Sequence, residues 1–296
     1  MNTTATTHEN NQPIRPLTQQ HQQHFHQVAI SPSAAAHSAR PLRIILLRHG
    51  ESVGNVDQKA YVTTPDWKVP LTSLGEYQAR KAGQELYNLI HGSSENKASQ
   101  MIVYHSPYKR TTQTTEHLLT CFPSSQITSV REEPRISEQQ WGNYQNEAVV
   151  RNARNERHGF GRFYYRFPSG ESGLDVYSRV SSFISTLVRD CQQYHKAGYN
   201  MDQMNIVIVT HGLALRLFLM RWFQFSVQEF EQSKNPDNAS LIVMDRKCVG
   251  PYKWYELDPN HREALNLPET CGKPRNVRLH HLDEEPCPHF MEEKDT

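Results

Sequence analysis

Hydrophobic and polar positions alternate along the middle of the chain in a way that predicts strands and helices in turn. Short apolar runs bounded by polar residues are typical of buried strands, and they occupy 42–47, 101–104 and 206–209. Two later runs, 241–244 and 252–255, are interpreted as further strands. Between them, apolar residues at three- and four-residue steps predict helices over 73–90, 174–194 and 213–223. This alternation favours a three-layer α/β/α sandwich with a mainly parallel central sheet.

Two of the helix starts carry capping signals. Thr72 is placed as the N-cap of the 73–90 helix. Ser106 followed by Pro107 predicts a cap and a first helical position, opening a helix that runs to about Leu119.

The two ends of the chain lack this periodicity. Residues 1–40 are rich in Gln, His, Thr and Ser and hold few large apolar side chains, so the burial available there does not offset the entropy of ordering. We therefore expect 1–40 to be a disordered polar tail, 41–268 to be the folded domain and 269–296 to be a loose C-terminal tail. The histidines His21, His24 and His26 fit this polar tail better than a metal site.

Composition and charge narrow the class of protein. The 296 residues carry 32 Lys+Arg against 31 Asp+Glu, which excludes a nucleic-acid binder that works through bulk positive potential. No apolar run approaches the roughly 20 residues of a membrane-spanning helix, and residues 1–11 have no apolar core for a secretory signal. The five cysteines are scattered and form no C-x-x-C pair, which predicts unpaired thiols in a reducing compartment, the cytoplasm or the nucleus.

The polar residues that could bind a ligand or take part in catalysis come after predicted strands. The strand at 42–47 runs into Arg48 and His49, the strand at 101–104 precedes Arg110, and the strand at 206–209 runs into His211. The carboxyl ends of parallel strands in an open α/β sheet face a common crevice. We therefore expect two arginines and two histidines to meet at one pocket.

Such a pocket suits a phosphoryl group. Guanidinium groups match phosphate oxygens bidentately, and helix N-termini add backbone donors. A neutral imidazole can attack phosphorus, and a second one can stabilise the charge that builds on the equatorial oxygens. The leaving oxygen needs a proton, so a carboxylic acid is expected nearby.

Four motifs in sequence resemble the histidine phosphatase superfamily, in its phosphoglycerate-mutase-like branch. They are Arg48-His49-Gly50-Glu51-Ser52 with Asn55, Leu71-Thr72-x-x-Gly75, Ser106-Pro107-x-x-Arg110-x-x-Gln113-Thr114 and Thr210-His211-Gly212. The stretches 161–168 and 216–223, with Glu171-Ser172, are similar to the group of broad-range acid phosphatases and phosphoglycerate-mutase-like proteins. The resemblance covers roughly 43–244 and implies the same α/β/α fold.

The resemblance also implies a role for each matching residue. His49 is similar to the nucleophile that becomes a phosphohistidine, and His211 to the second pocket histidine. The phosphate ligands that it implies are Arg48, Arg110 and Asn55. Glu138 falls where the family carries its proton donor, although Glu132 and Glu133 lie close by.

The function expected on these grounds is metal-independent hydrolysis of small phosphomonoesters through a phosphohistidine, with a broad substrate range and no cofactor. A mutase is the first alternative, but residues 56–61 depart from the phosphoglycerate mutase pattern associated with substrate enclosure. A non-catalytic regulatory scaffold on the same fold is the second, with the two tails as sites that recruit partners.

Two further features call for an interpretation. In the stretch 151–166, five arginines are interleaved with aromatic residues. This pattern is typical of nucleotide or RNA binding, but we favour an amphipathic helix with its aromatics packed on the sheet and some arginines at the pocket mouth. Glu51, beside His49, is interpreted as a structural carboxylate.

Overall fold

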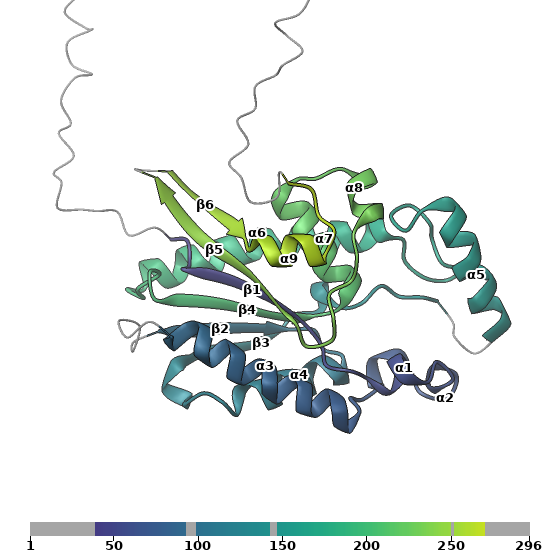
Figure 1. Cartoon of the computed structure of the whole chain (residues 1–296), viewed down its shortest axis with the longest axis horizontal. Helices are drawn as coiled ribbons and strands as arrows, with labels where there is room; N and C mark the ends of the chain where they lie inside the picture. The colour runs from purple at the N-terminus through teal and green to yellow at the C-terminus, as the bar shows by residue number, and fades with distance from the viewer. Residues whose placement is uncertain (1–38, 93–98, 143–146, 250–251, 270–296) are drawn as a thin grey trace, which may run out of the picture. The chain divides into compact units, whose positions relative to one another are not determined.

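The computed structural model describes residues 39–92, 99–142, 147–249 and 252–269 (Figure 1). Six strands form one sheet in the order β3-β2-β4-β1-β5-β6. Their bounds are β1 Arg43–Arg48, β2 Gln100–His105, β3 Ile127–Glu132, β4 Met204–Thr210, β5 Leu241–Val249 and β6 Tyr252–Leu257. The strands β1 to β4 pair in parallel, whereas β5 is antiparallel to both of its neighbours. The prediction of a mainly parallel sheet is confirmed.

Helices cover both faces of the sheet because the side chains of each central strand alternate between two apolar cores. Ile45 and Leu47 of β1 belong to the core formed with α3 (Ser73–His91) and α4 (Lys109–Leu119). Ile44 and Leu46 belong to the core formed with α6 (Gly173–Lys196) and α7 (Gly212–Phe223). Figure 1 shows these two helix pairs on opposite sides of the sheet. The predicted three-layer α/β/α sandwich is confirmed.

Shorter helical segments connect these layers. Their bounds are α1 Val53–Val56, α2 Ala60–Thr63, η3 Asp66–Lys68, η4 Ser124–Gln126, η5 Pro134–Ile136, α5 Glu147–Phe160, α8 Val227–Gln232 and α9 Pro259–Ala264.

Of the two predicted N-caps, the structure confirms that of α3 and not that of α4. The Thr72 hydroxyl accepts a hydrogen bond from the backbone N–H of Gly75 at 3.0 Å, so the predicted cap of α3 is confirmed. The helix α4 begins at Lys109 with Tyr108 as its N-cap, so the prediction of a Ser106 cap was wrong. The Ser106 hydroxyl lies before the helix, where it contacts Nε2 of His211 at 2.8 Å and accepts from the backbone N–H of Tyr108 at 3.4 Å.

The ends of three parallel strands place the site. The register pairs Arg48 of β1 with Thr210 of β4, and His105 of β2 with Val209 of β4. These three strands therefore end at one edge of the sheet, and the segments that follow them begin side by side. Two backbone hydrogen bonds of 3.0 Å, from His49 to Thr210 and from Ser106 to Val209, extend the ladder by one more residue.

The predicted tails, 1–40 and 269–296, lie outside the described residues except for residues 39, 40 and 269, so their character stays a prediction. Of the cysteines in the described part of the chain, Cys121, Cys191 and Cys248 are thiols without a disulfide. No helix in the described ranges is both long enough and apolar enough to span a bilayer.

Candidate active site

Five of the six residues expected at the site line one cavity of about 210 Å³, which we call the His49 cavity. These are Arg48, His49, Asn55, Arg110 and Glu138. Arg48 and His49 lie at the end of β1, Asn55 in α1, Arg110 in α4 after β2, and Glu138 after β3 and η5. His211, the sixth, is fully buried and lies beside His49 rather than in the wall of this cavity.

The imidazole of His49 is held in one tautomer. Its Nδ1 lies 2.7 Å from the carbonyl oxygen of Gly50, and because a carbonyl can only accept, Nδ1 carries the proton. Nε2 then keeps its lone pair. Burial and, after it, the charges of Arg110 and Arg48 lower the pKa of His49 well below its ordinary value. His49 is therefore a neutral imidazole with a nucleophilic nitrogen.

One nitrogen of each guanidinium group in the cavity wall is held by hydrogen bonds to the protein. Nη1 of Arg48 donates to the carbonyl oxygen of Pro236 at 2.7 Å, and Nη1 of Arg110 donates to both the carbonyl and the carboxylate of Asp66 at 2.8 Å. In the described part of the chain, the Nε atoms of both guanidinium groups are buried and have no hydrogen-bond partner. Two guanidinium groups in the wall of one cavity suit an anion, because their charges favour it and their planar donors match its oxygens.

The surroundings of Glu138 raise the pKa of its carboxyl group. Burial raises its pKa, and so does the charge of Asp66, while the Gln139 N–H and the charges of Arg110 and Arg48 oppose the shift. One carboxyl oxygen, Oε1, accepts from the backbone N–H of Gln139 at 3.0 Å. Glu138 thus keeps its proton to a higher pH than an exposed glutamate does.

The neighbouring glutamates are placed differently. Burial raises the pKa of Glu133, but hydrogen bonds from Arg135 outweigh it and hold that pKa below its ordinary value. The two side chains form an ion pair at 2.6 Å. Glu132 is exposed at the end of β3. Of the three glutamates, Glu138 alone lines the His49 cavity in the described structure.

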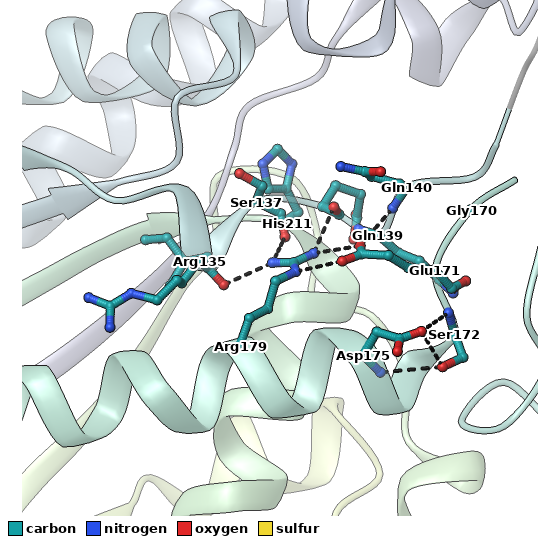
Figure 2. Close-up of polar contacts among 12 residues, drawn as sticks. Arg135, Ser137, Gln139, Gln140, Gly170, Glu171, Ser172, Asp175, Arg179 and His211 are labelled. Atoms are coloured by element: carbon teal, nitrogen blue, oxygen red, sulfur yellow. Dashed lines mark hydrogen bonds and ion pairs between the residues drawn. The ribbon is translucent and has the colours of Figure 1, made fainter.

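An arginine on α6 fixes the segment that carries Glu138 (Figure 2). Arg179 donates to the carbonyl oxygens of Arg135, Ser137 and Glu138 at 2.7–2.9 Å. The same guanidinium makes two hydrogen bonds of 3.0 Å with the carboxylate of Glu171.

Glu171 extends this clamp to the residues after Glu138. Its carboxylate accepts from the backbone N–H of Gln140 at 3.0 Å, and its carbonyl accepts from the Gln139 amide at 2.7 Å. The Glu171-Ser172 motif therefore has a structural reason: it bonds the chain on both sides of Glu138 to the start of α6.

His211 packs edge-to-face against His49, with ring centroids 5.2 Å apart. Its Nε2 lies 2.8 Å from the hydroxyl of Ser106, and its Nδ1 is buried without a hydrogen-bond partner in the described part of the chain. Burial and the nearby charge of Arg110 lower its pKa well below the ordinary value. The second histidine is thus neutral as well.

Asn55 lies at the rim of the cavity with its amide oriented. The oxygen Oδ1 accepts from the backbone N–H and the hydroxyl of Ser52 at 3.0 and 3.1 Å, and from Nδ2 of Asn238 at 3.3 Å. These contacts identify Nδ2 of Asn55 as the end of the amide that donates toward a ligand.

Several wall residues were missed in the sequence. They are Gln58, Tyr61, Asp66, Trp141 and Asn235. Gln58 and Tyr61 fall in the segment 56–61, whose departure from the mutase pattern was the one available signal. The other three lie in connections with no periodicity, and only the fold brings them to the cavity. The structural role of Glu51 is confirmed, since its carboxylate accepts from the Thr72 hydroxyl at 2.8 Å.

The arginine-rich stretch is partly helical. The helix α5 ends at Phe160, and Gly161 follows with a φ of +104°, a conformation that glycine adopts without strain. The expectation that the aromatics pack on the sheet was wrong for Phe160 and Tyr164, which are exposed. Phe163 is buried in the core that covers one face of the sheet, where it contacts rings of α6 and α8. The guanidinium of Arg157 lies 4.8 Å from the ring centroid of Trp141, a residue of the cavity wall. The side chain of Arg154 lies outside the described part.

The structure is that of an α/β/α protein whose carboxyl sheet edge carries two anchored guanidinium groups, a neutral imidazole and a carboxyl group with a raised pKa. The model of the histidine phosphatase superfamily (branch 1) matches residues 44–252, and the chain belongs to this superfamily.

Named relatives make the similarity more specific. The chain is 45% identical over 223 residues to the phosphoglycerate mutase-like protein AT74 of Arabidopsis thaliana, covering 75% of this chain and 70% of that protein. It is 28% identical to the broad-range acid phosphatase DET1 of Saccharomyces cerevisiae, covering 70% of this chain and 86% of that protein. A mycobacterial glucosyl-3-phosphoglycerate phosphatase, solved with VO3, has the same fold with a TM-score of 0.56 at 21% identity, covering 73% of this chain and 97% of that one.

Proposed function

We propose that this protein is a phosphomonoester hydrolase that works through a phosphohistidine at His49. The observation that carries the proposal is the pair of arginines that line one cavity with His49. Arg48 and Arg110 line this cavity together with His49, and their charges act on its neutral imidazole. An anion with tetrahedral oxygens matches this donor set.

In the proposed first step, the two arginines and Asn55 bind the phosphoryl oxygens. Nε2 of His49 attacks phosphorus, and a P–N bond forms as the P–O bond to the leaving group breaks. Glu138 gives its proton to the departing oxygen, so an alcohol leaves. The imidazolium form of His211 is not required, since a neutral ring nitrogen with a proton can stabilise the equatorial oxygens.

In the second step, the Glu138 carboxylate takes a proton from water, and the hydroxyl oxygen attacks the phosphohistidine. The P–N bond breaks, inorganic phosphate leaves, and both His49 and Glu138 return to their starting forms. No cofactor enters either step, and metal independence is part of the proposal.

The names of two relatives support a phosphatase. Besides the yeast broad-range acid phosphatase, the chain is 26% identical to an acid phosphatase of Mycobacterium tuberculosis, covering 68% of this chain and 85% of that protein. The relatives called phosphoglycerate mutase-like carry a name that describes similarity to a mutase.

The test is a phosphate-release screen over sugar phosphates, nucleotides, phosphoglycerates and phosphopeptides, run with EDTA present. We expect release from several esters, and we expect the His49→Ala variant to lose activity on the order of a million-fold. Rapid interconversion of 2- and 3-phosphoglycerate without phosphate release would contradict hydrolysis. Loss of activity with chelator would contradict metal independence, and full cellular function of His49→Ala would favour the scaffold.

A further inference from the structure

A second cavity of about 420 Å³, which we call the outer cavity, adjoins the His49 cavity. Three residues, Tyr61, Asp66 and Trp141, line both. A phosphoryl group held by Arg48 and Arg110 would direct the rest of an ester past these shared residues. The outer cavity is therefore the place for the leaving group.

The wall of the outer cavity is aromatic and nearly uncharged. Tyr61, Trp67, Tyr108 and Trp141 supply rings, while hydroxyl and amide groups come from threonines, a serine and Gln140. Asp66 is the one charged side chain among the described residues of this wall. Two cations lie near it without forming part of it: Lys68, 4.8 Å from the Trp67 ring centroid, and Arg157, 4.8 Å from the Trp141 ring centroid.

Asp66 is fixed at the junction between the cavities. Its carbonyl and its carboxylate both accept from Nη1 of Arg110 at 2.8 Å, and 16% of its side chain is exposed. A bound phosphate dianion would balance the charges of Arg48 and Arg110. The carboxylate of Asp66 would then add one more negative charge next to the leaving group.

We propose that Asp66 is a specificity determinant that disfavours esters with a negatively charged leaving group and accepts a hydrogen bond from a hydroxyl of a neutral, polyhydroxylated one. Like charges brought together at a site with few neutralising cations are costly, whereas an alcohol can donate to the carboxylate. The rings of the outer cavity suit the C–H faces of such an alcohol. The inference rests on the proposed hydrolase activity and names its substrate class.

The test uses two esters that differ in one group. Glycerol 3-phosphate carries a hydroxymethyl group where 3-phosphoglycerate carries a carboxylate. We expect the native protein to hydrolyse glycerol 3-phosphate with a kcat/KM at least about tenfold higher. In Asp66→Asn, which keeps an oxygen acceptor for Arg110 but loses the charge, this ratio should fall about fivefold or more.

The matched control is Asp57→Asn, which removes the same charge from an exposed carboxylate in the segment leading to α2 and should leave the ratio unchanged. A parallel loss on both esters in Asp66→Asn, with the ratio unchanged, would overturn the inference and leave Asp66 a structural partner of Arg110. A ratio that falls equally in Asp57→Asn would also overturn it. p-Nitrophenyl phosphate separates the two proposals: if the native protein fails to hydrolyse even this activated ester, the proposed function itself has failed.

Discussion

At the scale of single residues, the pKa values of His49 and Glu138, which line the same cavity, are shifted in opposite directions. Burial and two guanidinium charges lower the pKa of His49, and burial raises the pKa of Glu138. The proposed first step needs His49 unprotonated and Glu138 protonated. We therefore expect kcat/KM to rise with pH as His49 loses its proton and to fall as Glu138 loses its own, which gives a profile with a maximum.

Glu138→Gln tests the acid role. We expect kcat/KM on glycerol 3-phosphate to fall about 100- to 10,000-fold, and the decline of activity at high pH to disappear, because the group whose deprotonation causes it is gone. p-Nitrophenyl phosphate needs no protonation of its leaving group, so its first step should persist and give a burst of p-nitrophenolate before slow turnover. The measurement is a pH–rate profile with both esters.

Glu132→Gln is the control for that variant, since Glu132 is an exposed carboxylate on the strand before the same segment. It should behave as the native protein does. If the pH–rate profile of Glu138→Gln were unchanged, or if Glu132→Gln lost the decline at high pH, Glu138 would not be the proton donor.

At the scale of elements, α6 acts on the site without lining the His49 cavity. Arg179 holds three carbonyl oxygens of the segment 135–138 and is itself paired with Glu171 (Figure 2). Removing the guanidinium leaves these carbonyls without their donor and Glu171 without its ion-pair partner. The position of Glu138 should then lose definition.

We expect Arg179→Met to lower kcat about tenfold or more with a smaller change in KM, and to lower the free energy of unfolding by about 1–3 kcal/mol. Arg179→Lys, which restores one charge but not the planar set of donors, should recover part of the stability and little of kcat. Steady-state kinetics and urea unfolding provide both readouts.

Arg189 is an exposed arginine of the same helix, and Arg189→Met is the matched control. This variant should change neither kcat nor the free energy of unfolding. If Arg179→Met lost stability but kept kcat and its pH profile, Arg179 would be a structural residue only.

The sequence predicted the elements whose patterns are strongly apolar and missed those whose patterns are not. All strands with buried runs were found, because their apolar side chains face cores on both sides of the sheet. The edge strand β3 was missed: its residues are half-buried or exposed, so no apolar run marks it. The short helices α1 and α2 have four residues each, too few for a helical period.

At the scale of the whole molecule, the site is an assembly of distant segments. The residues that follow strands were found in the sequence because parallel strands must end at one edge. Asp66, Trp141 and Asn235 were missed because connections without periodicity carry them, and only the tertiary fold decides where such connections lie. The motif residues are therefore visible in the sequence, while the wall that receives the leaving group is not.

Two buried neutral histidines also make the stability of the whole fold depend on pH. Below about pH 6.5 the unfolded chain protonates His49 and His211, whereas the folded chain keeps them neutral because their pKa values are lowered. The unfolded state thus binds more protons, and stability is lost as the pH falls below that value. Glu138 works in the opposite direction, since its raised pKa makes the folded state the stronger proton binder above about pH 4.5.

His49→Asn should therefore gain stability relative to the native protein as the pH falls below 6.5, by up to about 1.4 kcal/mol per pH unit. Urea unfolding at a series of pH values measures this difference. The variant His158→Asn, at an exposed position on α5, should show no such trend. A difference that shrinks as the pH falls would mean that His49 is protonated in the folded protein.

The most direct test of the account is the chemical state of His49 during turnover. The protein is mixed with p-nitrophenyl phosphate, quenched rapidly at alkaline pH, digested and mapped by mass spectrometry. We expect one phosphoryl group on the imidazole of His49, with more of it trapped in Glu138→Gln because the second step is slowed there. Turnover without any phosphorylated histidine, or a phosphoryl group on a different residue, would contradict it.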